Sequence, residues 1–557
     1  MHCIAEILDK HNAIQSDLTT WIEQLKWKQI TVPVVSSRHS GVYGSVLSSL
    51  REPRGMTQDE YISYDGSGLA QLIRAKEVKA SELLDLALER VSILNPEVNA
   101  VVRIMEEDAR TAVEECHADG VFTGVPFLAK DLGAHFAGHP TSAGSRLAAD
   151  VVAKQDTELV RRLRTTGVSI FGKTNLPEFG LTPYTEPELW GPCRNPWDLT
   201  RTPGGSSGGS GAAVAVGFAP MAGAGDGGGS IRIPGSCCGL FGLKPTRGRT
   251  PTGPFRGQVW RGATVEHILS RSVRDSAIML DATHGADPGA PYEITLPEHP
   301  FAEEIGRAPG RLRIAWTTKP TLGSKVHPDC IIAVEEAVGL LEDLGHELIE
   351  AEPQIDGKGF ARAFMLMVAS EVGADIHDAE TVLGRKAKRS ELEPATQALS
   401  LLSQSLSARE FSSALRLLER EARSVGAFFE THDMLLTPTI ATPPARIGEL
   451  APTPAEQLQL RILGLIGSGH LVKMIGLLDE VAGHAFDFTP WTPVFNVTGQ
   501  PAMSVPLHWN QDGLPIGVHF VGHFGAEATL FRLAKQLERA RPWFDQLPRI
   551  AKNIPRT

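Results

Sequence analysis

TPGGSSGGSGAAVAVGFAPMAGAGDGGGSIRIPGSCCGLFGLKP, residues 202–245, is the stretch around which this chain of 557 residues is organised. It places three serines, Ser206, Ser207 and Ser230, in glycine-rich surroundings, with an apolar helix-like run between the two glycine clusters. Such clusters suit positions where backbone N–H groups must approach a ligand closely. A flexible linker has a similar composition, but this stretch continues into the apolar AAVAVGFAPMAGAG. We therefore expect a buried functional element.

The composition restricts the class of protein. With 42% hydrophobic and 21% charged residues, the chain resembles ordinary soluble globular proteins. Its net charge of −11 disfavours non-specific attraction to nucleic acid or anionic membranes. The six cysteines match no zinc-site spacing, so we expect reduced thiols, no metal and a cytoplasmic location. Asp9, Lys10 and His11 interrupt the apolar core that a signal peptide needs, and no apolar run is long enough to cross a bilayer.

Apolar periodicity predicts that helices and strands alternate along the chain. Helices are expected around Leu69–Ile73, from an N-cap at Ser81 to Asn95-Pro96, from an N-cap at Asp156 to Gly167, and at residues 106–117, 330–344 and 526–539. Strands are expected at residues 99–105, 125–129, 168–171, 502–506 and 516–521. This alternation predicts an α/β fold with a parallel or mixed sheet.

The chain divides into a short extension and one large domain. In residues 1–60 an apolar stripe predicts a helix that packs on the main body, formed by Leu18, Trp21, Ile22 and Leu25. Residues 61–557 form the large domain, and its part from 300 to 490 reads as helix-rich. Within that part, the leucine-rich run 458–481 is interpreted as core packing, with the wall of a hydrophobic pocket as the alternative.

Three known motif patterns match the chain, and two of them are rejected. Residues 167–174 match the phosphate loop, but the four residues between its glycines read as a strand. Residues 223–228 match the dinucleotide fingerprint, but SIRIP with its proline follows where a helix would be needed. Residues 205–209 match the nucleophile elbow of α/β-hydrolases. A proline-bounded loop precedes them instead of a strand, so the elbow is kept only as an alternative.

A lysine and two of the serines suggest nucleophilic catalysis. Lys130 ends the apolar run GVPFLAKD (124–131), where burial would lower its pKa and let the amine act as a base. An ordinary lysine at a strand end is the competing interpretation. Ser230 follows three glycines whose N–H groups could stabilise an oxyanion. A serine needs a base beside it, which Lys130 could supply if Ser206 relays the proton.

At these positions the chain resembles the amidase signature hydrolases. The resemblance rests on GGSSGGSGAAVA, the spacing of 24 residues from Ser206 to Ser230, DGGGSIRIP and the upstream PFLAKD. Supporting matches from about residue 64 onward include GKTNLPEFG, RNPWDLTRTPGG, FNVTGQPAMSVP and GLPIGVHFVG. The resemblance implies one large catalytic domain of the α/β class. Its central mixed sheet would be covered by helices on both faces, and residues 300–490 would set substrate specificity.

The resemblance also implies a role for each site residue. Ser230 would be the nucleophile, Ser206 the bridging serine in a cis peptide, and Lys130 the terminal base of a Ser–cis-Ser–Lys triad. The oxyanion hole would be formed by Gly227, Gly228 and Gly229. Supporting residues that hold this arrangement would be Asp226, Arg232 and Ser207, which replaces the nucleophile-elbow interpretation of Ser207.

The implied activity is hydrolysis of a carboxylic amide through an acyl-enzyme, without metal or cofactor. The stretch 230–249 is similar to bacterial amidases that act on aryl, peptide-like or nylon-oligomer amides. A small hydrophobic amide is therefore expected, with ester or carbamate cleavage also open. The alternative is the A-type subunit of a glutamine-dependent tRNA amidotransferase, although the extra N-terminal residues and the lack of a basic stretch disfavour it. We expect no nucleic-acid partner and no membrane span, and a homodimer is left open.

Overall fold

The computed structural model describes residues 55–115, 119–323, 325–474, 482–552 and 554. They belong to one unit that begins at Gly55. The helix expected over Leu18–Leu25 lies outside the described residues. Among those residues no helix has the length and apolar character needed to span a membrane.

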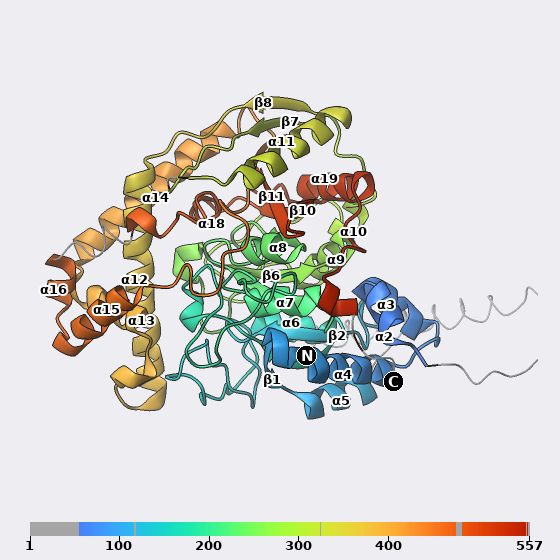
Figure 1. The fold of residues 1–557 in the computed structure, drawn as a ribbon, viewed down its shortest axis with the longest axis horizontal. Coiled ribbons are helices and arrows are strands. Elements are labelled where there is room, and N and C mark those ends of the chain that lie inside the picture. Colours follow the sequence, from blue (N-terminus) through green and yellow to red (C-terminus); the bar gives the residue numbers. More distant parts are fainter. Residues whose placement is uncertain (1–54, 116–118, 324, 475–481, 553, 555–557) are drawn as a thin grey trace, which may run out of the picture. The chain divides into compact units, whose positions relative to one another are not determined.

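A mixed sheet forms the centre of this unit (Figure 1). Its eleven strands are β1 (Val101–Ile104), β2 (Pro126–Lys130), β3 (Ser169–Thr174), β4 (Met221–Asp226), β5 (Phe241–Lys244), β6 (Val265–Ser270), β7 (Arg313–Trp316), β8 (Glu347–Glu350), β9 (Met434–Pro438), β10 (Ala502–Trp509) and β11 (Pro515–Gly522). Their spatial order is β1-β3-β2-β4-β6-β5-β10-β11-β9-β7-β8. Strand β2 pairs in parallel with β3 and β4, whereas the run from β4 to β9 is antiparallel. The predicted α/β class with a mixed sheet is confirmed.

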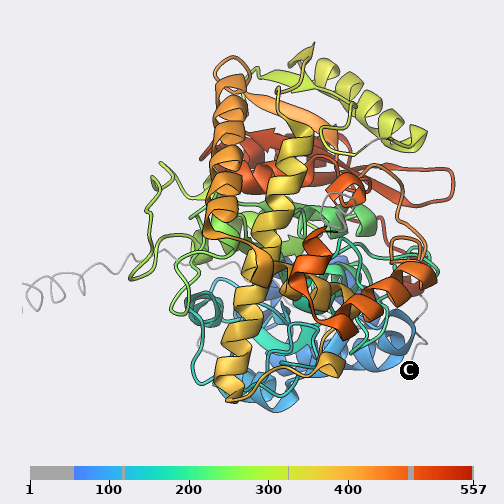
Figure 2. The same ribbon diagram turned by 90° about the vertical axis from the view of Figure 1, so that its left-hand side faces the viewer.

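Helices surround the sheet and build a separate layer at one side (Figures 1 and 2). They are α2 (Gln58–Ser63), α3 (Gly66–Arg74), α4 (Ala80–Val98), α5 (Glu106–Glu114), α6 (Glu158–Thr165), α7 (Gly208–Ala215), α8 (Arg232–Cys238), α9 (Val273–Thr283), α10 (Phe301–Glu304), α11 (Pro328–Asp343), α12 (Gly357–Leu383), α13 (Pro394–Ser405), α14 (Ala408–Phe428), α15 (Pro454–Ile466), α16 (Gly469–Met474), α18 (Thr492–Thr498) and α19 (Glu527–Ala540).

Strand β11 separates two layers of helices. Successive side chains of a strand point to opposite faces of its sheet. Val518 and Phe520 pack in an apolar core with residues of α11 and α19. A Cβ placed on Gly517, directly before Val518, would lie 2.8 Å from the Cα of Ser236 in α8. Helix α8 therefore covers the opposite face, and only glycine permits so close an approach.

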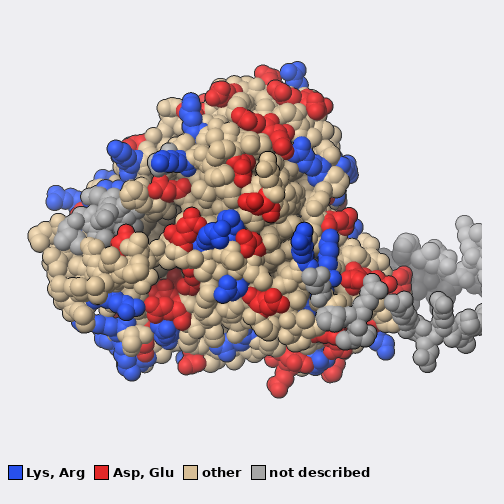
Figure 3. All heavy atoms as spheres, viewed as in Figure 1, with Lys and Arg blue, Asp and Glu red and all other residues tan. Residues whose placement is uncertain are grey.

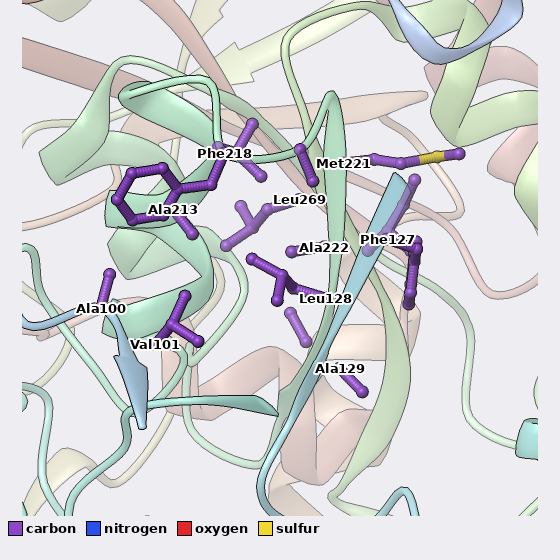
Figure 4. Close-up of a cluster of buried hydrophobic side chains, with 14 of the residues drawn as sticks. Ala100, Val101, Phe127, Leu128, Ala129, Ala213, Phe218, Met221, Ala222 and Leu269 are labelled. Atoms are coloured by element: carbon purple, nitrogen blue, oxygen red, sulfur yellow. The ribbon is translucent and has the colours of Figure 1, made fainter. Parts of the chain in front are cut away.

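A second core lies around β2 and β4 and fixes the position of α7. Figure 4 shows Leu128 of β2 beside Ala222 of β4, with Ala213 of α7 on one side of them and Phe127 of β2 on the other. Helix α7 consists of small residues, GGSGAAVA, which let its backbone come close to its neighbours. A Cβ on Gly209 would lie 2.3 Å from the backbone nitrogen of Asn175, directly after β3. The glycines after Ser207 are thus required by packing.

A helix follows the dinucleotide fingerprint at residues 223–228, although the sequence predicted none. This helix, α8, begins at Arg232 and contains Pro234. Proline is tolerated in a first helical turn because the N–H groups there have no partner within the helix. Residues 223–226 of the fingerprint lie in β4, whose last residue is Asp226.

Two predicted helix caps are wrong. Helix α4 starts after Lys79, with Ser81 inside it, and continues through Pro96 to Val98. It ends only at Asn99, whose backbone is left-handed. The Asn95 side chain accepts hydrogen bonds from the backbone N–H groups of residues 100 and 101, which follow the helix. Helix α6 starts after Thr157, because the Asp156 carboxylate is instead bound by the N–H of residue 137 and by an arginine.

The segment 300–490 contains long helices and also strands that were not predicted. Helices α12 and α14 run along one side in Figure 2, and β7, β8 and β9 add the far edge of the sheet. Core packing, the favoured interpretation of the leucine-rich run, is wrong for the exposed stripe of α15, which consists of Leu458, Ile462, Leu465 and Ile466. In Figure 3 this end of the molecule is mostly uncharged, whereas acidic and basic side chains are mixed elsewhere on the same face.

Candidate active site

Strand β2 brings Lys130 to the serine-rich stretch. The Nζ of Lys130 donates a hydrogen bond to Ser206 Oγ at 2.8 Å and a longer one to the carbonyl oxygen of Gly225 at 3.4 Å. Both side chains are buried, with Lys130 3% and Ser206 2% exposed. The peptide bond between Gly205 and Ser206 is cis, as the family resemblance implied. Two of the predicted site residues are therefore in direct contact.

The surroundings of Lys130 favour its neutral form. Every residue of β2 is buried, and burial lowers the pKa of Lys130 to about 8. The carboxylates of Glu266 and Asp226 oppose this effect and raise the pKa. A neutral amine has a lone pair that can accept a proton. The competing interpretation was an ordinary lysine at a strand end, and the full burial and lowered pKa of Lys130 disfavour it.

Ser230 lies next to the segment that carries Ser206. The N–H of Ser207 donates to the carbonyl oxygen of Ser230 at 3.3 Å, and the Ser230 side chain is 8% exposed. In the described part of the chain, no hydrogen bond joins the hydroxyls of Ser206 and Ser230. Catalytic hydrogen bonds are often long without substrate and shorten in the substrate complex. The arrangement thus leaves Ser230 beside the Lys130–Ser206 pair.

Ser207 has structural contacts only. Its Oγ donates to the carbonyl oxygen of Gly225 at 3.2 Å and accepts from the N–H of the same residue at 3.3 Å. This reciprocal pair joins the start of α7 to β4. Ser207 therefore holds the two serine-bearing segments together.

Asp226 and Arg232 hold the glycine loop between them. The Asp226 carboxylate accepts hydrogen bonds from the N–H of Gly229 at 2.7 Å and of Ile231 at 3.1 Å. It also pairs with the Arg232 guanidinium, with Nη2 to Oδ1 at 2.9 Å and Nε to Oδ2 at 3.0 Å. Neither side chain is exposed. Burial alone would raise the pKa of Asp226, but Arg232 holds it well below its usual range.

Three residues near the C-terminus complete this support, and sequence reasoning missed their role. Asn496 accepts from Arg232 Nη2 at 2.6 Å and donates to Asp226 Oδ1 at 2.9 Å. The carbonyl oxygen of Thr492 accepts from the same Arg232 nitrogen at 3.0 Å. His519 Nε2 accepts from Arg232 Nη1 at 2.9 Å, and burial keeps the pKa of this imidazole far below its usual value. The sequence signal that could have indicated a role for His519 is its polar side chain inside the apolar run of β11.

The glycine loop offers backbone donors beside Ser230. The N–H of Gly229 is used by Asp226, and Thr492 Oγ1 donates to the carbonyl oxygen of Gly228 at 2.8 Å. Among the described residues, the N–H groups of Gly227 and Gly228 have no hydrogen-bond partner. Of the three N–H groups predicted to bind an oxyanion, those of Gly227 and Gly228 are therefore available, whereas that of Gly229 is directed at a carboxylate.

The three glycines differ in what they tolerate, which gives a first prediction. Gly229 has a φ of +130°, and a Cβ there would lie 2.4 Å from Thr492 Oγ1. At Gly228 the nearest atom would be Phe364 Cζ at 3.8 Å. We expect Gly229→Ala to lower the free energy of unfolding by about 1–3 kcal/mol, and Gly228→Ala to leave it nearly unchanged. Urea denaturation measures both stabilities, and equal values for the two variants would contradict the difference in space between Gly229 and Gly228.

Aromatic side chains lie beside the glycine loop. Trp260 lies 3.1 Å from the Cβ position of Gly227, and Phe364 of α12 faces Gly228. Phe364 also stacks with Phe360 at 6.3 Å between ring centroids and meets Phe486 edge-on at 5.6 Å. The segment predicted to set specificity thus contributes an apolar wall. Within the described residues, no three His, Cys, Asp or Glu side chains are grouped so that they could hold a metal ion.

Comparisons with known proteins show the family of this chain. The profile of the family described as Amidase matches residues 82–531. The chain is 36% identical over 501 residues to the 6-aminohexanoate-cyclic-dimer hydrolase of Pseudomonas sp. (strain NK87), covering 88% of this chain and 98% of that protein.

Two solved structures have a similar fold. One is a 6-aminohexanoate cyclic dimer hydrolase complexed with substrate, with a TM-score of 0.80, 34% identity, and coverage of 88% of this chain and 99% of that one. The other is a bacterial aryl acylamidase of the amidase signature family, with a TM-score of 0.77, 25% identity and the same coverage.

Proposed function

This chain belongs to the Amidase family of amidase signature enzymes, and we propose that it hydrolyses a carboxylic amide through an acyl-enzyme on Ser230. The other members of the triad are Ser206, which relays the proton, and Lys130, which receives it. The observation that carries this proposal is the 2.8 Å hydrogen bond between Lys130 and Ser206 in a buried setting, beside Ser230.

Acylation begins with attack of Ser230 Oγ on the amide carbonyl carbon. The Ser230 proton passes to Ser206, whose own proton passes to Lys130. The carbonyl oxygen becomes an oxyanion, which the N–H groups of Gly227 and Gly228 stabilise. When the C–N bond breaks, the leaving nitrogen takes a proton back along the same relay. The products of this stage are an ester on Ser230 and a free amine.

Deacylation repeats the sequence with water as the nucleophile. Lys130, neutral again, accepts a proton from water through Ser206. The C–O bond to Ser230 then breaks, and the serine recovers its proton. The net reaction is amide plus water to carboxylic acid plus amine. In this scheme the two serines and the lysine perform the proton transfers, and the backbone N–H groups stabilise the oxyanion.

The apolar wall supports a hydrophobic amide as substrate. Trp260, Phe364 and Phe486 would face the acyl or amine portion of a bound amide, and burial of such groups is favourable. The relatives named above include hydrolases of a cyclic 6-aminohexanoate dimer and an aryl acylamidase, so an aryl or oligomeric amide is the first candidate. Ester and carbamate cleavage use the same acyl-enzyme and belong in the same assay.

A substrate panel tests this proposal. The purified full-length chain is incubated with an anilide, an aliphatic amide, the cyclic 6-aminohexanoate dimer, an ester and a carbamate, and amine or alcohol release is measured. We expect turnover of the anilide or the cyclic dimer without any partner protein. Turnover only of glutamine, and only with partner subunits and an aminoacylated tRNA, would instead support the amidotransferase alternative.

The lowered pKa of Lys130 predicts how activity depends on pH. The base must be neutral, so kcat/KM is low where the lysine is protonated and rises as pH increases through its pKa. The midpoint is expected near the pKa of about 8, well below the usual value for lysine. A pH profile of kcat/KM between pH 5 and pH 10, run on the free enzyme at low substrate, measures it. A profile that falls as pH rises from 6 to 8 would exclude a neutral lysine base.

A further inference from the structure

A small cavity lies beside Lys130. It has a volume of about 20 Å³ and is lined by Lys130 of β2, Glu266 of β6 and side chains of α6 and α9. This volume is enough for about one water molecule. Strands β4 and β6 pair so that Glu266 lies opposite Gly225, whose carbonyl oxygen accepts from Lys130. The cavity therefore borders the proposed base and a carboxyl group at the same time.

The space around the Glu266 carboxyl is created by glycines. A Cβ on Gly225 would lie 2.5 Å from Glu266 Oε1, and one on Gly133 would lie 2.8 Å from the same atom. Both distances are too short for any other residue to be accommodated without movement. Glycine at residues 225 and 133 thus leaves room for the Glu266 carboxyl beside Lys130.

Lys130 is the cationic group that acts on the Glu266 carboxyl. Among the described residues, none donates a hydrogen bond to the Glu266 carboxyl. The charged groups that act on it are Lys130 from β2 and Asp226 from β4, and Asp226 is already paired with Arg232. Helices α6 and α9 contribute only apolar or hydroxyl side chains to the cavity, namely Leu159, Leu163, Met279 and Thr283. The neighbouring His267 is bonded to Ser276 at 2.8 Å.

We propose that Glu266 is a positioning residue for the base, whose carboxylate stabilises the ammonium that forms on Lys130 during acyl transfer. This inference rests on the proposed function of the triad. When Lys130 takes up the Ser230 proton, a positive charge appears in a buried site, where an unpaired charge is unfavourable. The carboxylate across the cavity faces that charge, either directly or through one water molecule. No proton moves to Glu266, so the proton balance of the reaction is unchanged.

The electrostatics of the pair agree with this role. Burial raises the pKa of Glu266, and Lys130 lowers it, while the Glu266 carboxylate raises the pKa of Lys130. At the pH where the lysine is neutral, the carboxyl is ionised and ready to stabilise the ammonium. Removal of this charge therefore has a defined sign: the pKa of Lys130 falls, and the ammonium in the transition state is less stable.

Glu266→Gln tests the proposal because it removes the charge and keeps the shape. We expect the acidic limb of the kcat/KM profile to move to lower pH by roughly one unit, and kcat at the optimum to fall about tenfold. Glu266→Asp keeps the charge farther from the lysine and is expected to give an intermediate limb. Met279→Leu, a neutral change in the same cavity, is expected to give the wild-type limb.

A second measurement separates this inference from the proposed function. Phenylmethanesulfonyl fluoride forms an O–S bond to Ser230 with loss of fluoride, and the Ser230 proton passes to Lys130, so its rate reports the base without an amide substrate. The labelling rate in Glu266→Gln should show the same shift of the acidic limb. A folded Glu266→Gln protein with the wild-type limb in both assays would overturn the inference. If that variant does not fold, a wild-type limb in Glu266→Asp has the same meaning. Absence of both wild-type turnover and Ser230 labelling would instead refute the proposed function.

Discussion

Ser230→Ala is expected to abolish amide turnover and to leave the fold intact. The Ser230 hydroxyl is the proposed nucleophile. The neighbouring Ser207 does not replace it, because its hydroxyl donates to the carbonyl oxygen of Gly225 and accepts from the N–H of the same residue. Loss of a triad nucleophile reduces kcat by roughly 10⁴-fold or more. The Ser230 side chain makes no hydrogen bond to another described residue, so its removal should change the free energy of unfolding by less than about 1 kcal/mol. Steady-state kinetics and thermal denaturation measure the two effects.

Ser236→Ala is a matched control from the same stretch of sequence. Ser236 is buried on α8, and its Oγ accepts from the N–H of Gly517 at 2.8 Å. Its replacement should lower stability by about 1 kcal/mol through the lost hydrogen bond, with kcat/KM changed only a few-fold. Full activity in Ser230→Ala, or an equal loss of activity in both variants, would refute the assignment of the nucleophile.

Much of this site could be predicted from sequence because its chemistry is concentrated in one stretch. Ser206 and Ser230 are 24 residues apart, on either side of a helix and a strand that are both short and apolar, so local pattern was enough to find them. Lys130 was found by its position at the end of an apolar strand. Parallel pairing of β2 with β4 explains why a residue so far upstream reaches the serines.

The support of the site could not be predicted, because it comes from distant parts of the chain. Asn496 and His519 contact Arg232 across more than 250 residues of sequence. Nothing in their local sequence indicates that partner. Glu266 was missed for a similar reason: its importance depends on antiparallel pairing of β6 with β4, which places it opposite Gly225. Register between strands is set by packing of the whole sheet.

Lys130→Met is expected to reduce turnover by about 10²- to 10⁴-fold, the usual contribution of general acid–base catalysis. Methionine keeps the apolar stem but cannot accept the proton relayed by Ser206. Stability should be maintained or increase at neutral pH. Burial lowers the folded-state pKa of Lys130 from 10.5 to about 8, so the unfolded chain binds more protons between these values, and the burial cost is fully present below pH 8. Methionine removes that cost, and Glu266, whose pKa burial raises to about 7, can take up a proton once its partner is lost.

Lys173→Met gives the contrasting result and completes the test. Lys173 lies on β3 beside β2 and is equally buried, but its Nζ pairs with Asp131 Oδ1 at 3.3 Å and donates to Thr141 Oγ1 at 2.8 Å. Its removal leaves the Asp131 charge buried without a counter-ion, which should cost about 3–5 kcal/mol, while turnover per folded molecule stays within about tenfold of wild type. The two buried lysines on adjacent strands would then have different roles, Lys130 in turnover and Lys173 in stability. If Lys130→Met lost mainly stability and Lys173→Met mainly activity, Lys173 and not Lys130 would be the base.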